Sequence, residues 1–349
     1  MGNNQKPPRS FNTIRRSQTK ERAKRSQLSR VVLLAIFASV ALILLSLLIL
    51  GVCSIVDAVS NATDRPTEPN QPIFPSFNAR YDASYLASNS DVHIGELILV
   101  NEDHAFELFD ESNGHRLSNK VELKTMVPQD YNGKAPYLAA DGAKMEATAY
   151  QQFNKMMLAY LKEKNDDTIQ VNAKNAYREY ADQTSSIYST PAGYSDHHTG
   201  YCVALTIRTA TTTGISPSNA NYRWLFEHAH EYGFVQRYPE GKSDETGVSA
   251  YEHCFRYVGV AHATYMYSEG LCLEEYHELL KNSHTVNNAL RIAGADGKYY
   301  EVYYVAASQS DASEDAVTTF PVPSNYQYTV SGNNVDGFIV TVNLSVPAA

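Results

Sequence analysis

The sequence contains few cysteines: there are four in 349 residues, and only Cys202, Cys254 and Cys272 lie beyond residue 56. Small secreted domains that depend on disulfides carry far more cysteines for their length. Three cysteines cannot build such a scaffold. The part of the chain that contains them must therefore fold around a hydrophobic core.

Basic residues are scarce after residue 30. The first thirty residues hold nine Lys or Arg and a single acid, Glu21, so removing their charge of +8 from the whole-chain charge of −9 leaves −17 for the rest. A surface this acidic repels phosphate backbones. The charge argues against nucleic acid as a partner, and it disfavours tight binding to anionic wall polymers.

Residues 31–56 contain no ionisable side chain other than Cys53. A helix needs about 20 apolar residues to cross a bilayer, so this run is long enough to span one. A cleavable signal peptide would have a shorter apolar core followed by a small-x-small cleavage site. We therefore expect an uncleaved transmembrane signal anchor, with the basic tail 1–30 in the cytoplasm and the remainder outside.

Residues 57–91 are rich in Pro, Asn, Ser and Ala, which is typical of an unfolded tether. Beyond the tether, hydrophobic periodicity and turn residues predict a mixed α+β chain. The expected helices are 143–164, 221–232, 260–268 and 273–281, and the expected strands are 95–101 and 234–238. Aromatic and β-branched runs at 299–305 and 337–342 predict a small all-β appendage of three or four strands within 286–349.

Three blocks of the chain follow one another in the order of a known family. Residues 177–183 read Tyr-Arg-Glu-Tyr-Ala-Asp-Gln, residues 194–205 read Tyr-Ser-Asp-His-His-Thr-Gly-Tyr-Cys-Val-Ala-Leu, and residues 251–259 read Tyr-Glu-His-Cys-Phe-Arg-Tyr-Val-Gly. The first is similar to a Tyr-Arg-x-x-x-x-Gln block, and the others to the metal signatures Ser-x-His-x-x-Gly-x-Ala-x-Asp and Glu-x-x-His. Together they resemble the VanY-type zinc D-alanyl-D-alanine carboxypeptidases over roughly residues 95–285.

The resemblance implies a D,D-peptidase-like domain at 92–285, built from a small antiparallel sheet with helices. It also implies a zinc ion held by His, Asp and His, which lowers the pKa of a bound water to about 7. Carried onto this chain, the first zinc ligand is His197.

The family's other functional residues fall on matching positions of this chain. Glu252 matches the position of the family's general acid/base, which accepts the proton of the zinc-bound water and passes it to the leaving amine. Arg178 matches the position of the family's arginine, which stabilises the negative charge that develops on the scissile carbonyl oxygen. The substrate contacts implied by the resemblance are Ser195, Arg178 and Gln183.

Two positions depart from the family's pattern: Ala204 stands at the Asp position and Phe255 at the ligand His position. Neither side chain has a lone pair, and catalytic zinc sites use three protein ligands. Without zinc the attacking water keeps a pKa of about 15.7, and general acid–base catalysis by Glu252 alone contributes typically 10²–10⁴-fold. The family geometry therefore predicts a pseudoenzyme in which the zinc cofactor is doubtful.

The same motifs contain four other residues of zinc-binding type, namely His198, Cys202, His253 and Cys254. They leave three interpretations open. A displaced zinc site could combine His197 with some of them, Cys202 and Cys254 could form a disulfide, or the two cysteines could be buried free thiols.

The sequence thus predicts a membrane-anchored protein that faces the bacterial wall and resembles D-alanyl-D-alanine carboxypeptidases. We expect it to be catalytically impaired and to retain recognition of peptidoglycan stem peptides that end in D-alanine. One alternative is an active zinc D,D- or L,D-carboxypeptidase that works through rearranged ligands. Another, of a different class, is a structural or protein-interaction module.

Overall fold

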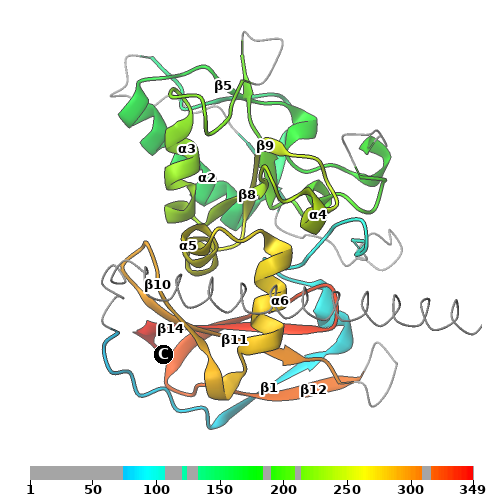
Figure 1. Cartoon of the computed structure of the whole chain (residues 1–349), viewed down its shortest axis with the longest axis vertical. Coiled ribbons are helices and arrows are strands. Elements are labelled where there is room, and N and C mark those ends of the chain that lie inside the picture. Colours follow the sequence, from blue (N-terminus) through cyan, green and yellow to red (C-terminus); the bar gives the residue numbers. More distant parts are fainter. Residues whose placement is uncertain are drawn as a thin grey trace, which may run out of the picture. The chain divides into compact units, whose positions relative to one another are not determined.

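Helices α5 (Val260–Glu269) and α6 (Leu273–Ser283) lie between two groups of strands in the computed structural model (Figure 1). The structure describes residues 74–106, 120–123, 133–183, 190–208, 214–308 and 316–348. The expected basic tail and the expected membrane segment lie outside these residues. Within the described part of the chain, no helix has the length and apolar character needed to cross a membrane.

The first group of strands contains the two metal-signature motifs. Its central sheet has the antiparallel order β6–β9–β8, formed by Cys202–Ala204, Tyr251–Tyr257 and Phe234–Tyr238. One face of this sheet packs on α2 (Ala147–Lys164), whose apolar stripe includes Phe153, Met157 and Tyr160. Burial of this stripe, rather than helix propensity alone, stabilises α2.

Several shorter elements complete this part. They are β2 (Lys120–Glu122), β3 (Leu138–Ala139), β4 (Lys144–Glu146), β5 (Ile169–Val171), β7 (Thr206–Ile207), α3 (Arg223–His228), α4 (Ser243–Thr246) and the 3₁₀ turns Ala173–Asn175, Tyr180–Asp182, Asp196–Thr199 and Ala229–Tyr232. The expected helix at 221–232 is therefore a short α-helix continued by a 3₁₀ turn. It ends as expected at Gly233, which adopts φ +84°, and a Cβ there would lie 2.7 Å from Tyr257.

The second group of strands forms a four-stranded antiparallel sheet of order β10–β11–β14–β13. These strands are Leu290–Ala293, Tyr299–Ala306, Gly337–Pro347 and Tyr326–Gly332, and the 3₁₀ turn Val286–Asn288 precedes them. Helix α6 lies against this sheet (Figure 1). Its residues Tyr276 and Leu280 share one buried core with Val302 and Ile339 of the sheet. The residues after 286 are thus packed against the helices of the preceding segment, and the structure does not separate them as an appendage.

The boundary expected at residue 91 is wrong. Strand β1 (Ala83–Ser88) lies inside the expected tether, yet it pairs with β12 (Val317–Val322) in antiparallel register, with Tyr85 opposite Phe320. The 3₁₀ turn Asn89–His93 follows it. A Pro- and Asn-rich composition does not exclude a strand whose pairing partner lies more than two hundred residues away.

The expected strand at 95–101 is also wrong. This segment is buried, with Leu97, Ile98 and Val100 at 2 % exposure or less, but it runs as irregular backbone. Its carbonyl groups instead accept hydrogen bonds from buried side chains, including the guanidinium of Arg256 on the oxygens of Glu96 and Ile98 (2.8 and 3.1 Å). The apolar run therefore correctly indicated that this segment is buried, but it wrongly indicated that the segment forms a strand.

Candidate functional site

The pairing of β6 with β9 decides which residues of the two motifs face one another. Val203 lies opposite Phe255, and Ala204 lies opposite Cys254. Because side chains alternate across a strand, Cys202, Ala204 and Cys254 share one face of the sheet while Val203 and Phe255 share the other. The first set forms a small buried cluster, and the second belongs to the main apolar core with α2.

His197 approaches the first of these faces from the 3₁₀ turn Asp196–Thr199, which precedes β6. Its Nδ1 lies 2.9 Å from the carbonyl oxygen of Ala176, which can only accept a hydrogen bond. Nδ1 therefore carries the proton and Nε2 keeps its lone pair. Burial and, to a smaller extent, the nearby Arg178 cation lower the pKa of His197 to about 3, so the ring is neutral at physiological pH.

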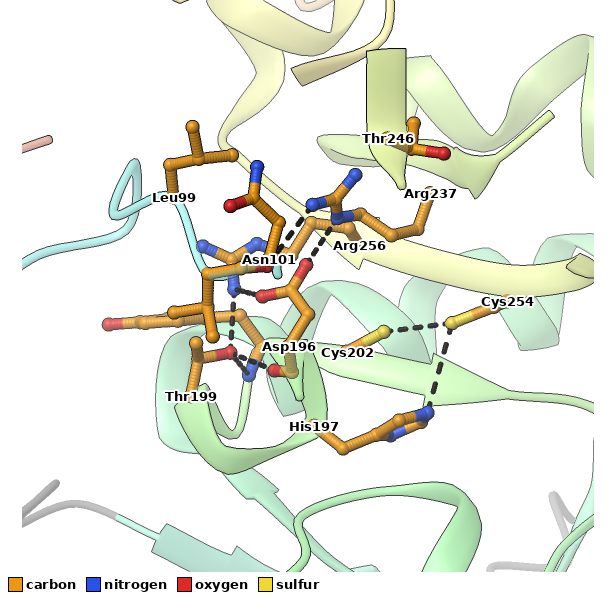
Figure 2. Close-up of polar contacts among 12 residues, drawn as sticks. Leu99, Asn101, Asp196, His197, Thr199, Cys202, Arg237, Thr246, Cys254 and Arg256 are labelled. Carbon is orange, nitrogen blue, oxygen red and sulfur yellow. Dashed lines mark hydrogen bonds and ion pairs between the residues drawn. The ribbon is translucent and has the colours of Figure 1, made fainter. Parts of the chain in front are cut away.

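Three potential ligand atoms converge at this point, as Figure 2 shows. Nε2 of His197 lies 3.9 Å from Sγ of Cys254, and the sulfurs of Cys202 and Cys254 are 2.9 Å apart. All three atoms lie within 4.8 Å of one another, and all three residues are buried. The two cysteines are free thiols. The expected proximity of Cys202 and Cys254 is therefore confirmed, in the form of thiols without a disulfide.

His198, the second histidine of the motif, forms hydrogen bonds to the backbone with both ring nitrogens. Its Nε2 accepts a hydrogen bond from the Gly193 amide at 3.1 Å, and its Nδ1 donates to the carbonyl of Arg178 at 2.9 Å. Both ring nitrogens are occupied, so neither is available to a metal. His198 instead ties the loop before the motif to the backbone of Arg178.

Arg178 and Gln183 lie next to this turn, as the family block implies. The Arg178 amide donates to the carbonyl of His197 at 3.2 Å, and Nη1 donates to Oε1 of Gln183 at 2.9 Å. Gln183 in turn donates to the carbonyl of Thr190 at 2.7 Å. Ser195 is buried directly before the turn, and its carbonyl accepts from the His198 amide. The structure thus brings Arg178, Gln183 and Ser195 to the same turn as His197.

The residues at the start of β9 are displaced by a bulge. Gln236 lies opposite Phe255 and Tyr238 lies opposite Tyr251, so four residues of β9 span the distance of two residues in β8. A bulge of this kind changes which side chains lie on the same face of the sheet as Cys202 and Cys254. As a result Tyr251 packs on Cys202, Ala204 and Cys254, although simple alternation would place it on the other face.

The bulge also affects the environment of the two neighbouring motif residues, His253 and Glu252. The ring of His253 lies 4.0 Å from that of Tyr251, and burial lowers the pKa of His253 to about 4. Glu252 is half-buried, and its carbonyl accepts from Nε2 of Gln236 at 3.2 Å. Tyr251 is the residue beside this cluster that the sequence did not reveal, because no periodicity signals a bulge.

Two buried arginines hold the His197 turn in place. Asp196 accepts a hydrogen bond from Nε of Arg237 at 2.6 Å and another from Nη1 of Arg256 at 3.0 Å, and all three side chains are fully buried. Figure 2 shows Asp196 between these two arginines. Arg237 also binds Glu274 of α6 through both terminal nitrogens, at 3.0 and 2.8 Å, so two cations face two carboxylates. This network was not predicted from the sequence. It fixes the residue that directly precedes His197.

The family model described as D-alanyl-D-alanine carboxypeptidase VanY matches residues 142–260, which include both motifs and the Arg178 block. Within these residues the chain is similar to the VanY family. The expected resemblance is therefore confirmed.

Two curated relatives carry the name D-alanyl-D-alanine carboxypeptidase. The protein from Enterococcus faecium is 33% identical over 174 residues, which cover 48% of this chain and 52% of that protein. The protein from Enterococcus faecalis (strain ATCC 700802 / V583) is 32% identical over 194 residues, covering 52% of this chain and 65% of that protein. The chain thus spans between about half and two thirds of the length of these relatives.

One solved structure shows the fold of the VanY-type domain. The crystal structure of the vancomycin resistance D,D-dipeptidase VanXYg, in complex with a D-Ala-D-Ala phosphinate analogue, superposes with a TM-score of 0.57 at 24% sequence identity. The match covers 75% of this chain and 98% of that chain. The mixed α+β architecture of the D,D-peptidase type is therefore confirmed.

The residues present do not fit the His, Asp and His zinc cage that the family resemblance implies. Ala204 offers a methyl group at the Asp position. Phe255 lies in the apolar core on the far face of the sheet, 5.2 Å from the ring of Phe226, so no side chain at this position reaches His197. The β9 residue opposite Ala204 and beside His197 is Cys254. The sequence prediction placed the family's second ligand histidine at position 255. The strand pairing indicates position 254 instead.

Proposed function

We propose that this chain recognises peptidoglycan stem peptides ending in D-alanine and that its carboxypeptidase activity is impaired relative to the family. One observation carries the proposal: Arg178, bonded to Gln183, adjoins His197, while Ala204 stands where the family places a carboxylate ligand. The groups implied in substrate binding are retained and a group implied in zinc binding is lost. Homology to D-alanyl-D-alanine carboxypeptidases supports the choice of substrate.

We further propose that residues 31–56 anchor the protein in a bacterial membrane with the VanY-type domain facing the wall. The proposal depends on the uncharged apolar run and the basic flank that precedes it. We expect the full chain to stay in the membrane fraction after an alkaline wash, and a chain lacking residues 1–56 to become soluble. Release of the full chain by the wash would contradict the anchor.

Replacing Arg178 by alanine should weaken binding of a stem pentapeptide that ends in D-Ala-D-Ala. A hydrogen bond to a charged group contributes about 1.5–3 kcal/mol, and about 1.4 kcal/mol corresponds to a tenfold change in affinity. We therefore expect the Kd, measured by isothermal titration calorimetry, to rise by roughly 10- to 100-fold. Arg178→Lys should recover part of the affinity, because it keeps the charge and loses the planar fork.

Arg208 provides a matched control for this experiment. It lies on the surface beside Asp167, with 40 % of its side chain exposed, and Arg208→Ala should leave the Kd unchanged. The isomeric peptide ending in L-Ala-L-Ala should bind weakly to the unmodified protein. Equal affinity for both isomers, or no effect of Arg178→Ala, would favour the alternative of a structural or protein-interaction module.

A second function, an active zinc carboxypeptidase with rearranged ligands, is favoured by one specific observation. His197, Cys202 and Cys254 place three metal-ligating atoms together beside the proposed peptide site. Release of D-alanine from the pentapeptide by metal-loaded protein would support this function. Binding of the peptide without release would support the impaired form.

A further inference from the structure

The cluster of His197, Cys202 and Cys254 has the composition of a metal site that differs from the one implied by the family. We infer that these three residues bind a thiophilic divalent cation, zinc first among them, in place of the family's His, Asp and His cage. The inference rests on the proposed function only in that both place a ligand beside His197. It concerns the metal and not the peptide, so the two can be tested separately.

The first argument is the preorganised histidine. Ligating histidines commonly donate their second ring N–H to a carbonyl or carboxylate, which fixes the tautomer and the ring orientation. The Ala176 carbonyl does this for His197, and it leaves the Nε2 lone pair directed toward Cys254 (Figure 2). That lone pair can accept from the Cys254 thiol, and it can bind a metal once the thiol has lost its proton.

The second argument is the position of the new thiols. Loss of the carboxylate at position 204 coincides with a cysteine at position 202, two residues earlier and therefore on the same face of β6. Cys254 faces Ala204 from β9. Cys202, two residues before Ala204, and Cys254, opposite Ala204, thus supply two sulfur donors to the same small volume beside His197.

The third argument is the spacing of the donor atoms. A tetrahedral zinc with Zn–S of about 2.3 Å and Zn–N of about 2.0 Å places two sulfurs about 3.8 Å apart and a sulfur and a nitrogen about 3.5 Å apart. The present separations are 2.9 Å between the sulfurs and 3.9 Å from Cys254 Sγ to His197 Nε2. Changes of about 1 Å or less would bring these atoms to coordinating distances.

Binding requires both thiols to release their protons, and no redox step is involved. Zinc bound here would polarise a nearby carbonyl, but two thiolates cancel both of its charges, whereas the single carboxylate of the family cage cancels one. A metal held in this way is compatible with impaired hydrolysis. The same two thiols cannot bind metal once they are oxidised to a disulfide, which makes reducing conditions essential to the test.

The test is a cobalt(II) titration of the full chain, purified with a phosphine reductant and stripped with a chelator. Free thiols are counted before each titration. We expect a thiolate-to-cobalt charge-transfer band that saturates at about one cobalt per chain and disappears when zinc is added. Cys202→Ser and Cys254→Ser should each remove about half of the band, and they and His197→Ala should each weaken binding by more than about 100-fold.

Cys272→Ser is the matched control, because Cys272 is a buried thiol at the start of α6, outside the cluster. Its band and affinity should equal those of the unmodified protein. Two results would overturn the inference: no charge-transfer band when the thiols are free, or a band of undiminished intensity in both Cys202→Ser and Cys254→Ser. A disulfide that resists the reductant and leaves no cobalt bound would overturn it as well.

These outcomes are distinguishable from failure of the proposed function. Cobalt binding without affinity for the D-Ala-D-Ala peptide would support the metal site and contradict the proposed function. Peptide binding without cobalt would do the opposite.

Discussion

Replacing Asp196 by asparagine should destabilise the fold by about 3–5 kcal/mol, one of the largest effects expected for a single substitution in this chain. The side chain is fully buried and accepts hydrogen bonds from Arg237 and Arg256, which are buried as well. The substitution keeps the shape of the side chain and removes its charge. Two buried guanidinium groups would then face one carboxylate, that of Glu274. An uncompensated buried charge is what makes breaking such a network costly.

Urea unfolding followed by circular dichroism measures this loss, and Asp167→Asn is the matched control. Asp167 pairs with Arg208 at 3.7 Å on the surface, where 37 % of its side chain is exposed. A surface ion pair of this kind contributes about 0–1 kcal/mol, so its loss should be hard to detect. Equal effects of the two substitutions would mean that the Asp196 network is solvated and does not hold the turn that carries His197.

The elements of the fold that depend on local pattern were predictable. The apolar stripe of α2, the two short helices joined at Gly270 and the β-rich runs that became β11 and β14 all appear near their expected bounds. Each of these signals lies within one stretch of the chain. Pairing between distant segments carries no such signal, which is why β1 was assigned to a tether although it pairs with β12.

The site shows the same division. The ordered motifs identified the turn that contains His197, and they identified Arg178 as its neighbour. The choice between positions 254 and 255 depends on the register of β9 against β6. The contact of Tyr251 with Cys202 and Cys254 depends on a bulge against β8. A shift of one residue moves a strand's side chains to the opposite face of the sheet. A motif aligned with an error of one residue therefore assigns the ligand position to a side chain in the apolar core. The buried arginines of the Asp196 network were invisible for a similar reason, since their partners lie on separate elements.

The register of β9 against β6 predicts which substitutions would rebuild the family's His, Asp and His zinc site. In a Cys202→Ala background, which removes the sulfur of β6, adding Ala204→Asp and Cys254→His should create a His, Asp and His set on one face of the sheet, around His197. We expect this triple variant to bind about one zinc per chain, measured by elemental analysis after dialysis. We also expect its zinc affinity to exceed that of Cys202→Ala alone by more than about 100-fold.

The matched variant carries Cys202→Ala, Ala204→Asp and Phe255→His. Position 255 lies in the apolar core beside Val203 and Phe226, so the new imidazole would be buried without a partner and away from His197. We expect no gain in zinc and a loss of stability of about 3 kcal/mol or more, from the vacated ring volume and the buried polar group. The opposite outcome, with zinc restored by Phe255→His and not by Cys254→His, would show that β9 pairs one residue away from the register described here. In that case the Glu252 motif would have its family spacing after all, and Cys254 would leave the cluster that we infer to bind metal.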